Sequence, residues 1–411
     1  MATIRASNPI LRASSSSIWR AGSSYAPRIA GSSPRFVRAM SSGPYGYYQV
    51  EGLAFQEYGE PKDVLKMMRH SISPGLPPSS VVLRTLAAPI NPADVNTIQG
   101  TYGAKPVFSS LFGTPKPAAL PGNEGVFEVV SDPPRGSGLT KGDWVIPART
   151  GFGTWRTYAV APADSVLRIA NRDLLDPRDV AAVAVNPCSA YRMLRDYATP
   201  PLREGDWFIQ NGANSAVGRA AIQLGSLWGY RSINVIRARP EGPAATQAMV
   251  KELKDLGADY VITEDELKAR DFGERVREWT EPGGGSVRLG LNCVGGQSAL
   301  TLAKTLSVGA TLVTYGGMSR QPVTPPTGLL IFKDIHFAGF WLSRWADADP
   351  AGAKKQTIDE ILDLIRRGRF RQSPMEDIPW TAQTSEHELK MAVQQTLEGY
   401  KNKKRIFVFN E

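Results

Sequence analysis

Residues 208–229 read FIQNGANSAVGRAAIQLGSLWG, and this stretch decides the fold. A short apolar run ends in a glycine-bounded turn from Gly212 to Gly218, and the turn leads directly into an amphipathic pattern. The run has the length of a buried strand, and the spacing of apolar residues after the turn is typical of a helix. The stretch therefore predicts a strand, a tight turn and a helix, which is the first half of a right-handed βαβ unit.

The same alternation extends over about residues 186–339. The expected strands are residues 208–212, 233–237, 259–263, 289–294, 311–317 and 335–340, and the clearest helices are residues 217–229, 246–257 and 272–280. Strands that alternate with amphipathic helices predict a parallel sheet that is doubly wound, with helices on both faces. We therefore expect an α/β domain over residues 186–342.

The flanking segments have a different pattern. Short β-like runs punctuated by proline and glycine fill about residues 47–182, which predicts a small barrel-like β domain. The C-terminal part holds two helical patterns, residues 357–368 and 386–399, and a final strand, residues 403–409. That order suggests a chain that returns to its first domain, so we expect a β-rich domain made of residues 44–185 and 343–411.

Composition limits the classes of function. The 411-residue chain is 42% hydrophobic and 21% charged, as expected of a globular protein with a sizeable core. Its net charge of +9 includes six arginines in residues 1–50, which contain no lysine or acid, so the remainder carries only +3. We therefore expect no nucleic-acid partner. No run of 18 apolar residues occurs, and no membrane span is expected.

The first segment has the composition of an organellar targeting sequence. Residues 1–40 are rich in serine and arginine and lack both acids and a secretory apolar core. Such composition predicts a mitochondrial transit peptide, with cleavage near residues 38–42 and a matrix location for the mature chain. The alternative is a basic tail with no targeting role.

Metal-based and triad chemistry are disfavoured. The two cysteines, Cys188 and Cys293, have no metal-ligand spacing, and the three histidines are far apart in the sequence. We therefore expect no bound metal. A Ser–His–Asp triad is disfavoured on the same grounds, although spacing in sequence does not exclude one.

The turn from Gly212 to Gly218 is suited to a pyrophosphate. A tight turn before a helix directs backbone N–H groups and the positive end of the helix dipole at one point. Ser215 stands where the dinucleotide fingerprint has glycine, so the motif alone is weak. The second strand, however, is followed by Arg237 and Arg239, where NAD-selective proteins place an acid. Arginines there favour the 2′-phosphate of NADPH, while the alternative is a solvated pair at a strand end.

Two further segments follow expected strands. They are Tyr315-Gly316-Gly317-Met318 and Phe340-Trp341-Leu342. Open α/β sheets bind ligands at the carboxyl ends of their strands, so both segments are candidate nicotinamide contacts. Turn glycines and core aromatics are the alternative interpretation.

Several phrases together resemble a known family. Residues 121–125 (PGNEG) and 141–145 (KGDWV) resemble segments of the medium-chain dehydrogenase/reductase superfamily, and Asn123 replaces the histidine that its zinc branch uses. The combination of INPADVNTIQGTYG (90–103), NPCSAYRML (186–194) and FWLSRW (340–345) resembles the mitochondrial 2-enoyl thioester reductases of the zinc-free branch. The resemblance covers about residue 48 to the C-terminus.

This resemblance implies a fold and an activity. The fold would be a GroES-like β-rich catalytic domain with a Rossmann-type domain, and the activity an NADPH-dependent reduction of enoyl-CoA or enoyl-acyl-carrier-protein in fatty-acid synthesis. The subunit would form a homodimer through the edge strand near residues 335–340. The implied cofactor contacts are Asn186, Asn214, Ser215, Ala216, Val217, Arg237, Ala238, Arg239, Tyr315, Gly316, Gly317, Met318, Phe340, Trp341, Leu342 and Lys404. Ala216 and Ala238 depart from the family's usual residues, which puts affinity in question.

The resemblance also implies that Tyr102 donates the proton. Saturating an α,β-unsaturated thioester needs a hydride at the β carbon and a proton at the α carbon, and negative charge builds up on the thioester oxygen. A phenol retains its proton at neutral pH, and Gly100 and Gly103 on either side would let the loop place the ring. The alternative is a tyrosine that only packs under its loop.

Two other functions remain open from the sequence. A quinone oxidoreductase would use the same fold and NADPH. A non-enzymatic nucleotide-bound protein that binds RNA or a partner is disfavoured by the charge of +3 beyond the leader and by the lack of a basic, aromatic stretch.

Overall fold

The computed structural model describes residues 48–73, 75–112, 114–280, 286–348, 352–397 and 403–410. All of them belong to one compact unit, Met40–Glu411. The proposed transit peptide, residues 1–40, lies outside the described residues. Among the described residues, no helix has the length and apolarity needed to cross a bilayer.

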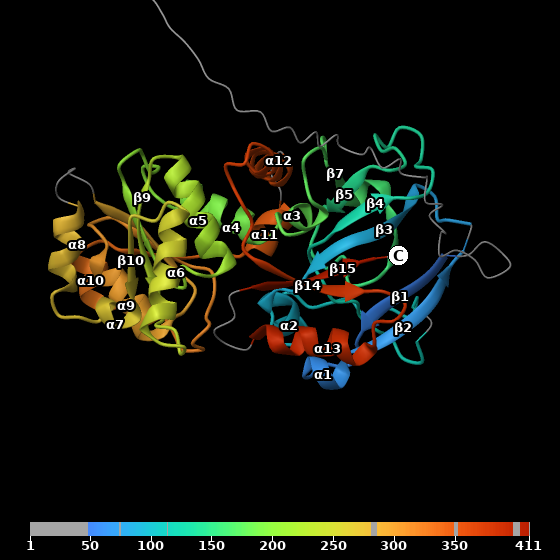
Figure 1. The fold of residues 1–411 in the computed structure, drawn as a ribbon, viewed down its shortest axis with the longest axis horizontal. Helices are drawn as coiled ribbons and strands as arrows, with labels where there is room; N and C mark the ends of the chain where they lie inside the picture. Colours follow the sequence, from blue (N-terminus) through green and yellow to red (C-terminus); the bar gives the residue numbers. More distant parts are fainter. Residues whose placement is uncertain are drawn as a thin grey trace, which may run out of the picture. The chain divides into compact units, whose positions relative to one another are not determined.

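Six parallel strands form one sheet, as the alternating pattern predicted (Figure 1). They are β8 (Trp207–Gln210), β9 (Arg231–Ile236), β10 (Tyr260–Thr263), β11 (Val287–Asn292), β12 (Thr311–Thr314) and β13 (His336–Gly339). The order is β10-β9-β8-β11-β12-β13, and every neighbouring pair is parallel. The chain direction across the sheet reverses between β8 and β11, which is the switch point where such sheets bind ligands.

Helices cover both faces of this sheet. They are α5 (Ala216–Leu227), α6 (Pro243–Asp255), α7 (Glu264–Leu267), α8 (Phe272–Thr280), α9 (Gly296–Thr305) and α10 (Thr327–Phe332). Consecutive residues of β8 point to opposite sides: Phe208 packs in the apolar cluster that contains α5, and Ile209 packs in the cluster that contains α8 and α9. Burial on two faces explains why these strands are almost continuously apolar in sequence.

The second sheet is mostly antiparallel and contains the end of the chain. Its strands are β3 (Ser80–Pro89), β4 (Val126–Val129), β5 (Trp144–Pro147), β6 (Tyr158–Pro162), β7 (Val166–Arg168), β14 (Met375–Trp380) and β15 (Lys404–Phe409). β15 pairs antiparallel with β3, so the final strand does return to the first domain. β1 (Tyr48–Ala54) and β2 (Lys66–Ile72) form a separate antiparallel hairpin. The predicted α/β fold is confirmed.

The described residues form further helical elements outside the two sheets and the helices given above. They are α1 (Pro61–Val64), α2 (Pro92–Ile98), η1 (Ala163–Ser165), α3 (Pro177–Ala181), α4 (Asn186–Asp196), α11 (Leu342–Ala348), α12 (Ala353–Arg366), α13 (Glu386–Gln394) and η4 (Gln395–Leu397). The largest apolar cluster joins residues of α4, α5 and α12 with residues of both sheets. A core shared in this way holds the two sheets in one packed body, and it places the start of α4 next to the β-rich domain.

Candidate functional site

Tyr102 lies just beyond the end of α2. The helix ends at Ile98 with Gln99 as its C-cap, and Gly100 follows with a φ of +74°, in the left-handed region that favours glycine. The backbone N–H groups of Thr101 and Tyr102 both donate to the Asn96 carbonyl, at 2.9 and 3.1 Å, and this fixes the turn. Gly103 shows no positive φ, and a Cβ there would meet Trp341 at an ordinary 3.5 Å. Of the two glycines beside Tyr102, only Gly100 is required by the backbone.

The Tyr102 hydroxyl meets the residues that follow β13. The indole Nε1–H of Trp341 donates to Tyr102 Oη at 2.9 Å, and the two rings stand nearly perpendicular with centroids 6.1 Å apart. Ser343 Oγ, on α11, lies 3.5 Å from the same Oη. Because Trp341 supplies a donor, the phenol keeps its own proton to give away. Tyr102 is half-buried, so that proton is within reach of a ligand.

The glycine turn after β8 has the shape that a phosphate site requires. Gly212 has a φ of +59°, and a Cβ at Gly218 would lie 2.5 Å from the Ala213 carbonyl oxygen. Ser215 is the N-cap of α5 and accepts a hydrogen bond from the Gly218 N–H at 3.1 Å. Glycine at 218 therefore lets the helix approach the strand closely, and the serine caps the helix without blocking its end. Asn214, Ala216 and Val217 lie in the same turn and at the start of α5.

Tyr315 belongs to the same region. Its buried hydroxyl lies beside the Ser215 hydroxyl and the Cys293 thiol and makes no hydrogen bond of normal geometry within the described residues. Burial and the neighbouring thiol hold the pKa of Tyr315 well above its ordinary value, and burial raises the pKa of Cys293 to about 11. The two glycines after Tyr315 differ: a Cβ at Gly316 would lie 3.2 Å from the Cβ of Cys293, whereas a Cβ at Gly317 would touch nothing. Met318, next in the segment, is exposed.

The two arginines after β9 are placed differently. Arg237 is exposed, and its positive charge acts against the effect of burial on the pKa of the Cys293 thiol, which lies under the glycine turn. The Arg239 side chain is only 5% exposed, and its Nε lies 3.7 Å from Glu241 Oε2. Ala238 between them is exposed. Arg237 is therefore the arginine that faces solvent at the strand end, while Arg239 is an internal residue with an acidic neighbour.

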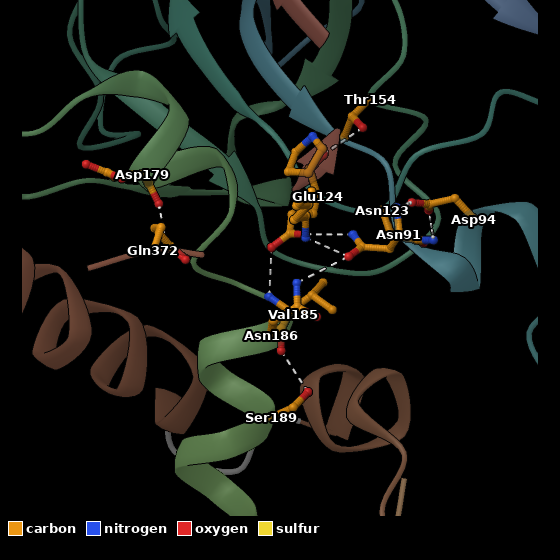
Figure 2. A network of polar contacts seen from close by, with 12 residues as sticks. Asn91, Asp94, Asn123, Glu124, Thr154, Asp179, Val185, Asn186, Ser189 and Gln372 are labelled. Carbon is orange, nitrogen blue, oxygen red and sulfur yellow. Dashed lines mark hydrogen bonds and ion pairs between the residues drawn. The ribbon is translucent and has the colours of Figure 1, made fainter. Parts of the chain in front are cut away.

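Asn186 and Lys404 come together in a buried polar network, whose asparagine and carboxylate members Figure 2 shows. Asn186 Nδ2 and Lys404 Nζ donate to Asn91 Oδ1, at 3.3 and 2.7 Å. The fully buried Glu124 carboxylate accepts from Asn91 Nδ2 at 2.7 Å, from the Val185 backbone N–H at 2.9 Å and from Lys404 at 3.3 Å. The network thus joins the start of α4, the turn before α2 and the start of β15.

A second carboxylate lies beside this network. Asp94 accepts from the Asn91 backbone N–H and from Asn123 Nδ2, both at 2.8 Å (Figure 2). Burial raises the pKa of Asp94 to about 6, because desolvation outweighs its hydrogen bonds. Asn123, at the position that suggested a zinc-free branch, also accepts from the Gly151 N–H at 2.8 Å. It serves as a bridge between α2 and the loop at Gly151.

The predicted residues fall into three groups. Tyr102, Trp341 and Leu342 meet around the start of α11, with Phe340 buried against Tyr197. The second group comprises the glycine turn, Tyr315 and Arg237, which gather around Cys293. The third comprises Asn186 and Lys404. Sequence reasoning missed Ser343, and it gave Asn91 and Glu124 no role in holding cofactor residues. The only signal was that Glu124 is an acid inside an apolar segment.

The residues present fit a phosphorylated dinucleotide. The open glycine turn, the buried Tyr315 hydroxyl beside it and the exposed Arg237 supply a close backbone approach, a polar group and a cation. Among the described residues, no three His, Cys, Asp or Glu side chains are grouped as a metal site would require.

Family models and curated relatives match most of the chain. The model described as zinc-binding dehydrogenase matches residues 216–364, and that of the alcohol dehydrogenase GroES-like domain matches residues 77–171. The mitochondrial enoyl-[acyl-carrier-protein] reductase of Yarrowia lipolytica is 47% identical over 321 residues, covering 78% of this chain and 81% of that protein. The Homo sapiens protein of the same name is 41% identical over 331 residues, covering 80% and 83%.

Solved structures give the same result. The complex of Etr1p with NADP and crotonyl-CoA has a TM-score of 0.82 at 39% identity, and the match covers 88% of this chain and 100% of that one. The mitochondrial 2-enoyl thioester reductase Etr1p/Etr2p heterodimer from Candida tropicalis has the same TM-score, identity and coverage. A putative NADPH:quinone reductase from Bacillus thuringiensis is 26% identical, with a TM-score of 0.72, over 88% of this chain and 99% of that one.

Proposed function

This chain belongs to the mitochondrial enoyl-[acyl-carrier-protein] reductases, within the zinc-binding dehydrogenase family, and on that premise we propose that it reduces 2-enoyl thioesters with NADPH. It is an oxidoreductase of mitochondrial fatty-acid synthesis, and enoyl-CoA is a substrate. One observation carries the proposal from the structure: the Tyr102 hydroxyl of the β-rich domain lies 2.9 Å from Trp341 Nε1, just beyond the carboxyl end of β13.

NADPH supplies the hydride when it is bound. The residues that we propose to hold it are the glycine turn with Asn214 to Val217, the segments Tyr315 to Met318 and Phe340 to Leu342, and Asn186 and Lys404. Arg237 is exposed at the strand end, so it is our candidate for the 2′-phosphate. Ala238 and Arg239 follow Arg237 in the sequence. The Arg239 side chain is buried and lies beside Glu241.

Tyr102 holds the proton that the α carbon receives. Because Trp341 donates to its oxygen, the phenolic O–H is oriented away from the indole and toward a ligand. As the proton leaves, the same indole N–H stabilises the charge that remains on the oxygen. The protein's other contribution is to fix this donor against the sheet edge where the cofactor binds.

The proposed partner is a second copy of the chain. β13 is an edge strand of the six-stranded sheet, and its outermost residues are exposed. The neighbouring α10 has no buried residue and exposes Leu330, Ile331 and Phe332 by 47, 65 and 81%. An unpaired edge beside an apolar helix is suited to two-fold pairing with another subunit. A relative of this chain forms a heterodimer. We therefore propose a homodimer through β13 and α10.

The remaining assignments complete the proposal. The catalytic domain comprises residues 44–185 and 343–411, and the NADPH-binding domain residues 186–342. Residues 1–40 direct the chain to the mitochondrial matrix. Enoyl-acyl-carrier-protein is a substrate alongside enoyl-CoA. The mechanism uses no metal, because Asn123, at the position of the zinc branch's histidine, instead bridges Asp94 and Gly151 through hydrogen bonds.

The test of the function is NADPH oxidation by the purified mature chain. Crotonyl-CoA and longer 2-enoyl-CoA thioesters are supplied in one series and simple quinones in another. We expect turnover with the thioesters and saturated acyl products. Turnover with quinones and none with thioesters would instead identify a quinone oxidoreductase of the same fold.

A further inference from the structure

Glu124 is a buried carboxylate to which the reaction assigns no role. Its side chain is 0% exposed, and three groups from three separate chain segments donate to it: Val185 N–H, Asn91 Nδ2 and Lys404 Nζ. Burying a carboxylate is costly unless it is paired with a cation and hydrogen-bonded. Glu124 meets that condition only because its neighbours all present hydrogen-bond donors.

A carboxylate fixes the orientation of the amide next to it. An ionised carboxylate has no proton, so Asn91 must direct Nδ2 at Glu124. Asn91 Oδ1 then points away from Nδ2 within the amide plane, and it accepts from Asn186 Nδ2 at 3.3 Å and from Lys404 Nζ at 2.7 Å. Donation therefore runs from Asn186 through Asn91 to Glu124, and the acceptor-only carboxylate at the end of this series sets its direction.

The last amide in this series of hydrogen bonds belongs to Asn186, which we propose as a cofactor contact. Asn186 is half-buried, and its Nδ2 is used by Asn91. Its Oδ1 therefore points to the opposite side of the amide and is the atom that can accept a hydrogen bond from a ligand. Lys404, held by Asn91 and Glu124, has a third N–H to donate. In both proposed cofactor contacts, the hydrogen bonds within the network therefore decide which atom is left for a ligand: an acceptor on Asn186 and a donor on Lys404.

We propose that Glu124 is a positioning residue that sets the amide orientation of Asn91 and, through it, of Asn186, so that Asn186 presents an acceptor to an N–H or O–H group of NADPH. This inference rests on the proposed function only in taking NADPH as the ligand. It assigns Glu124 and Asn91 to cofactor binding, although neither is expected to touch the cofactor.

The direct test is Glu124→Gln, which keeps the shape and turns one acceptor oxygen into a donor. The new glutamine would accept from Val185 and would turn its NH₂ toward the Asn91 NH₂, so two donors would face each other. Either they stay unpaired or Asn91 flips, and the flip turns its NH₂ toward the Lys404 ammonium and reverses Asn186. We expect the NADPH dissociation constant, measured by fluorescence titration without substrate, to rise about tenfold or more, equivalent to about 1.4 kcal/mol. The matched control is Glu128→Gln on β4, whose carboxylate pairs with Arg84, away from this network, and which should leave the constant within about twofold.

A second variant moves the carboxylate instead of removing it. In Asn91→Asp/Glu124→Gln, the new glutamine accepts from Val185 and donates to the new aspartate, which in turn accepts from Asn186 and Lys404. Charge, shape and the orientation of Asn186 are all restored. We expect the double variant to recover an NADPH dissociation constant within about threefold of wild type, while Asn91→Asp alone weakens binding because two carboxylates then face each other.

Each outcome decides the proposal. If the double variant recovers NADPH affinity, the proposal is supported, even if Glu124→Gln alone does not fold. A wild-type dissociation constant in a folded Glu124→Gln variant overturns it, and so does a double variant that is unfolded or still weak. Failure of the proposed function is separate: a wild-type chain that binds NADPH but leaves crotonyl-CoA unreduced refutes the reaction, and the titrations still test the amide orientation.

Discussion

Gly100→Ala tests whether the backbone after α2 is what places Tyr102. The left-handed conformation at φ +74° costs an alanine about 1–2 kcal/mol. The new Cβ would also lie 2.8 Å from Cγ of Tyr58. That ring is 44% exposed, but moving it would disturb its edge-on contact with Phe108 at 5.7 Å and its contact with the Lys105 ammonium at 5.6 Å. Overpacking of this kind adds about 1 kcal/mol at least, for a total of about 2–3 kcal/mol.

Thermal unfolding gives the first measurement. A loss of about 2–3 kcal/mol lowers the melting temperature by about 4–12 °C if the shift per kcal/mol is that of a medium-sized domain. Gly103→Ala is the matched control, because its φ is not positive and its Cβ would stand 3.5 Å from Trp341. We expect that variant to unfold within about 2 °C of wild type. Equal melting temperatures for the two variants would refute the backbone argument.

Turnover gives the second measurement. A displaced turn moves the Tyr102 hydroxyl away from Trp341, and a shift of about 1 Å is enough to reduce kcat by up to about a hundredfold. NADPH affinity should stay at the wild-type value, because no proposed cofactor residue lies in this turn. If kcat with crotonyl-CoA is unchanged in a destabilised Gly100→Ala variant, the turn matters for stability alone.

Four further outcomes are expected. Tyr102→Phe should lower kcat by about a hundredfold or more with an unchanged NADPH dissociation constant, and equal turnover would remove the phenol from the reaction. Arg237→Ala should weaken NADPH binding about tenfold or more and NADH binding hardly at all, and a parallel loss for both cofactors would contradict the 2′-phosphate role. Arg239→Ala removes a buried side chain and should mainly lower the stability of the protein. The pKa of Asp94 is about 6 in the folded state and 3.8 ordinarily, so between these pH values the folded state binds a proton that the unfolded state has lost. The stability of wild type relative to Asp94→Asn should therefore fall by about 3 kcal/mol as the pH rises from about 4 to 7. Denaturant titrations that show a constant difference would contradict this. Chelation of divalent ions should leave turnover unchanged, and a loss restored by zinc would overturn the metal-free mechanism.

The sequence was most informative about the parallel sheet. All six strands of that sheet could be placed within a few residues, because strands buried on both faces are nearly continuous apolar runs. The glycine turn was also predictable, since its conformation depends on residues close together in sequence. The hairpin of β1 and β2 had no comparable signal, because neither strand is a continuous buried run or a regular alternation of buried and exposed residues.

Contacts between distant residues could not be predicted in this way. Tyr102 and Trp341 are 239 positions apart, and no period or spacing relates them. The Glu124 network joins positions 91, 124, 185 and 404, which meet only because β15 pairs with β3 and α4 starts beside the β-rich domain. The burial of Arg239 was equally hidden, because a sequence shows a charge but not its neighbours.

The pairing of β15 with β3 also bears on how the chain is made. β3 pairs with residues 404–409, which are more than 300 positions later in the sequence, so this edge of the sheet stays open until those residues have been made and have folded onto it. Open strand edges are sites of aggregation, and a chain delivered N-terminus first exposes this one for the longest time. The enzyme is thus expected to depend on chaperone binding during import, and deletion of β15 should give an insoluble product and not a shortened enzyme.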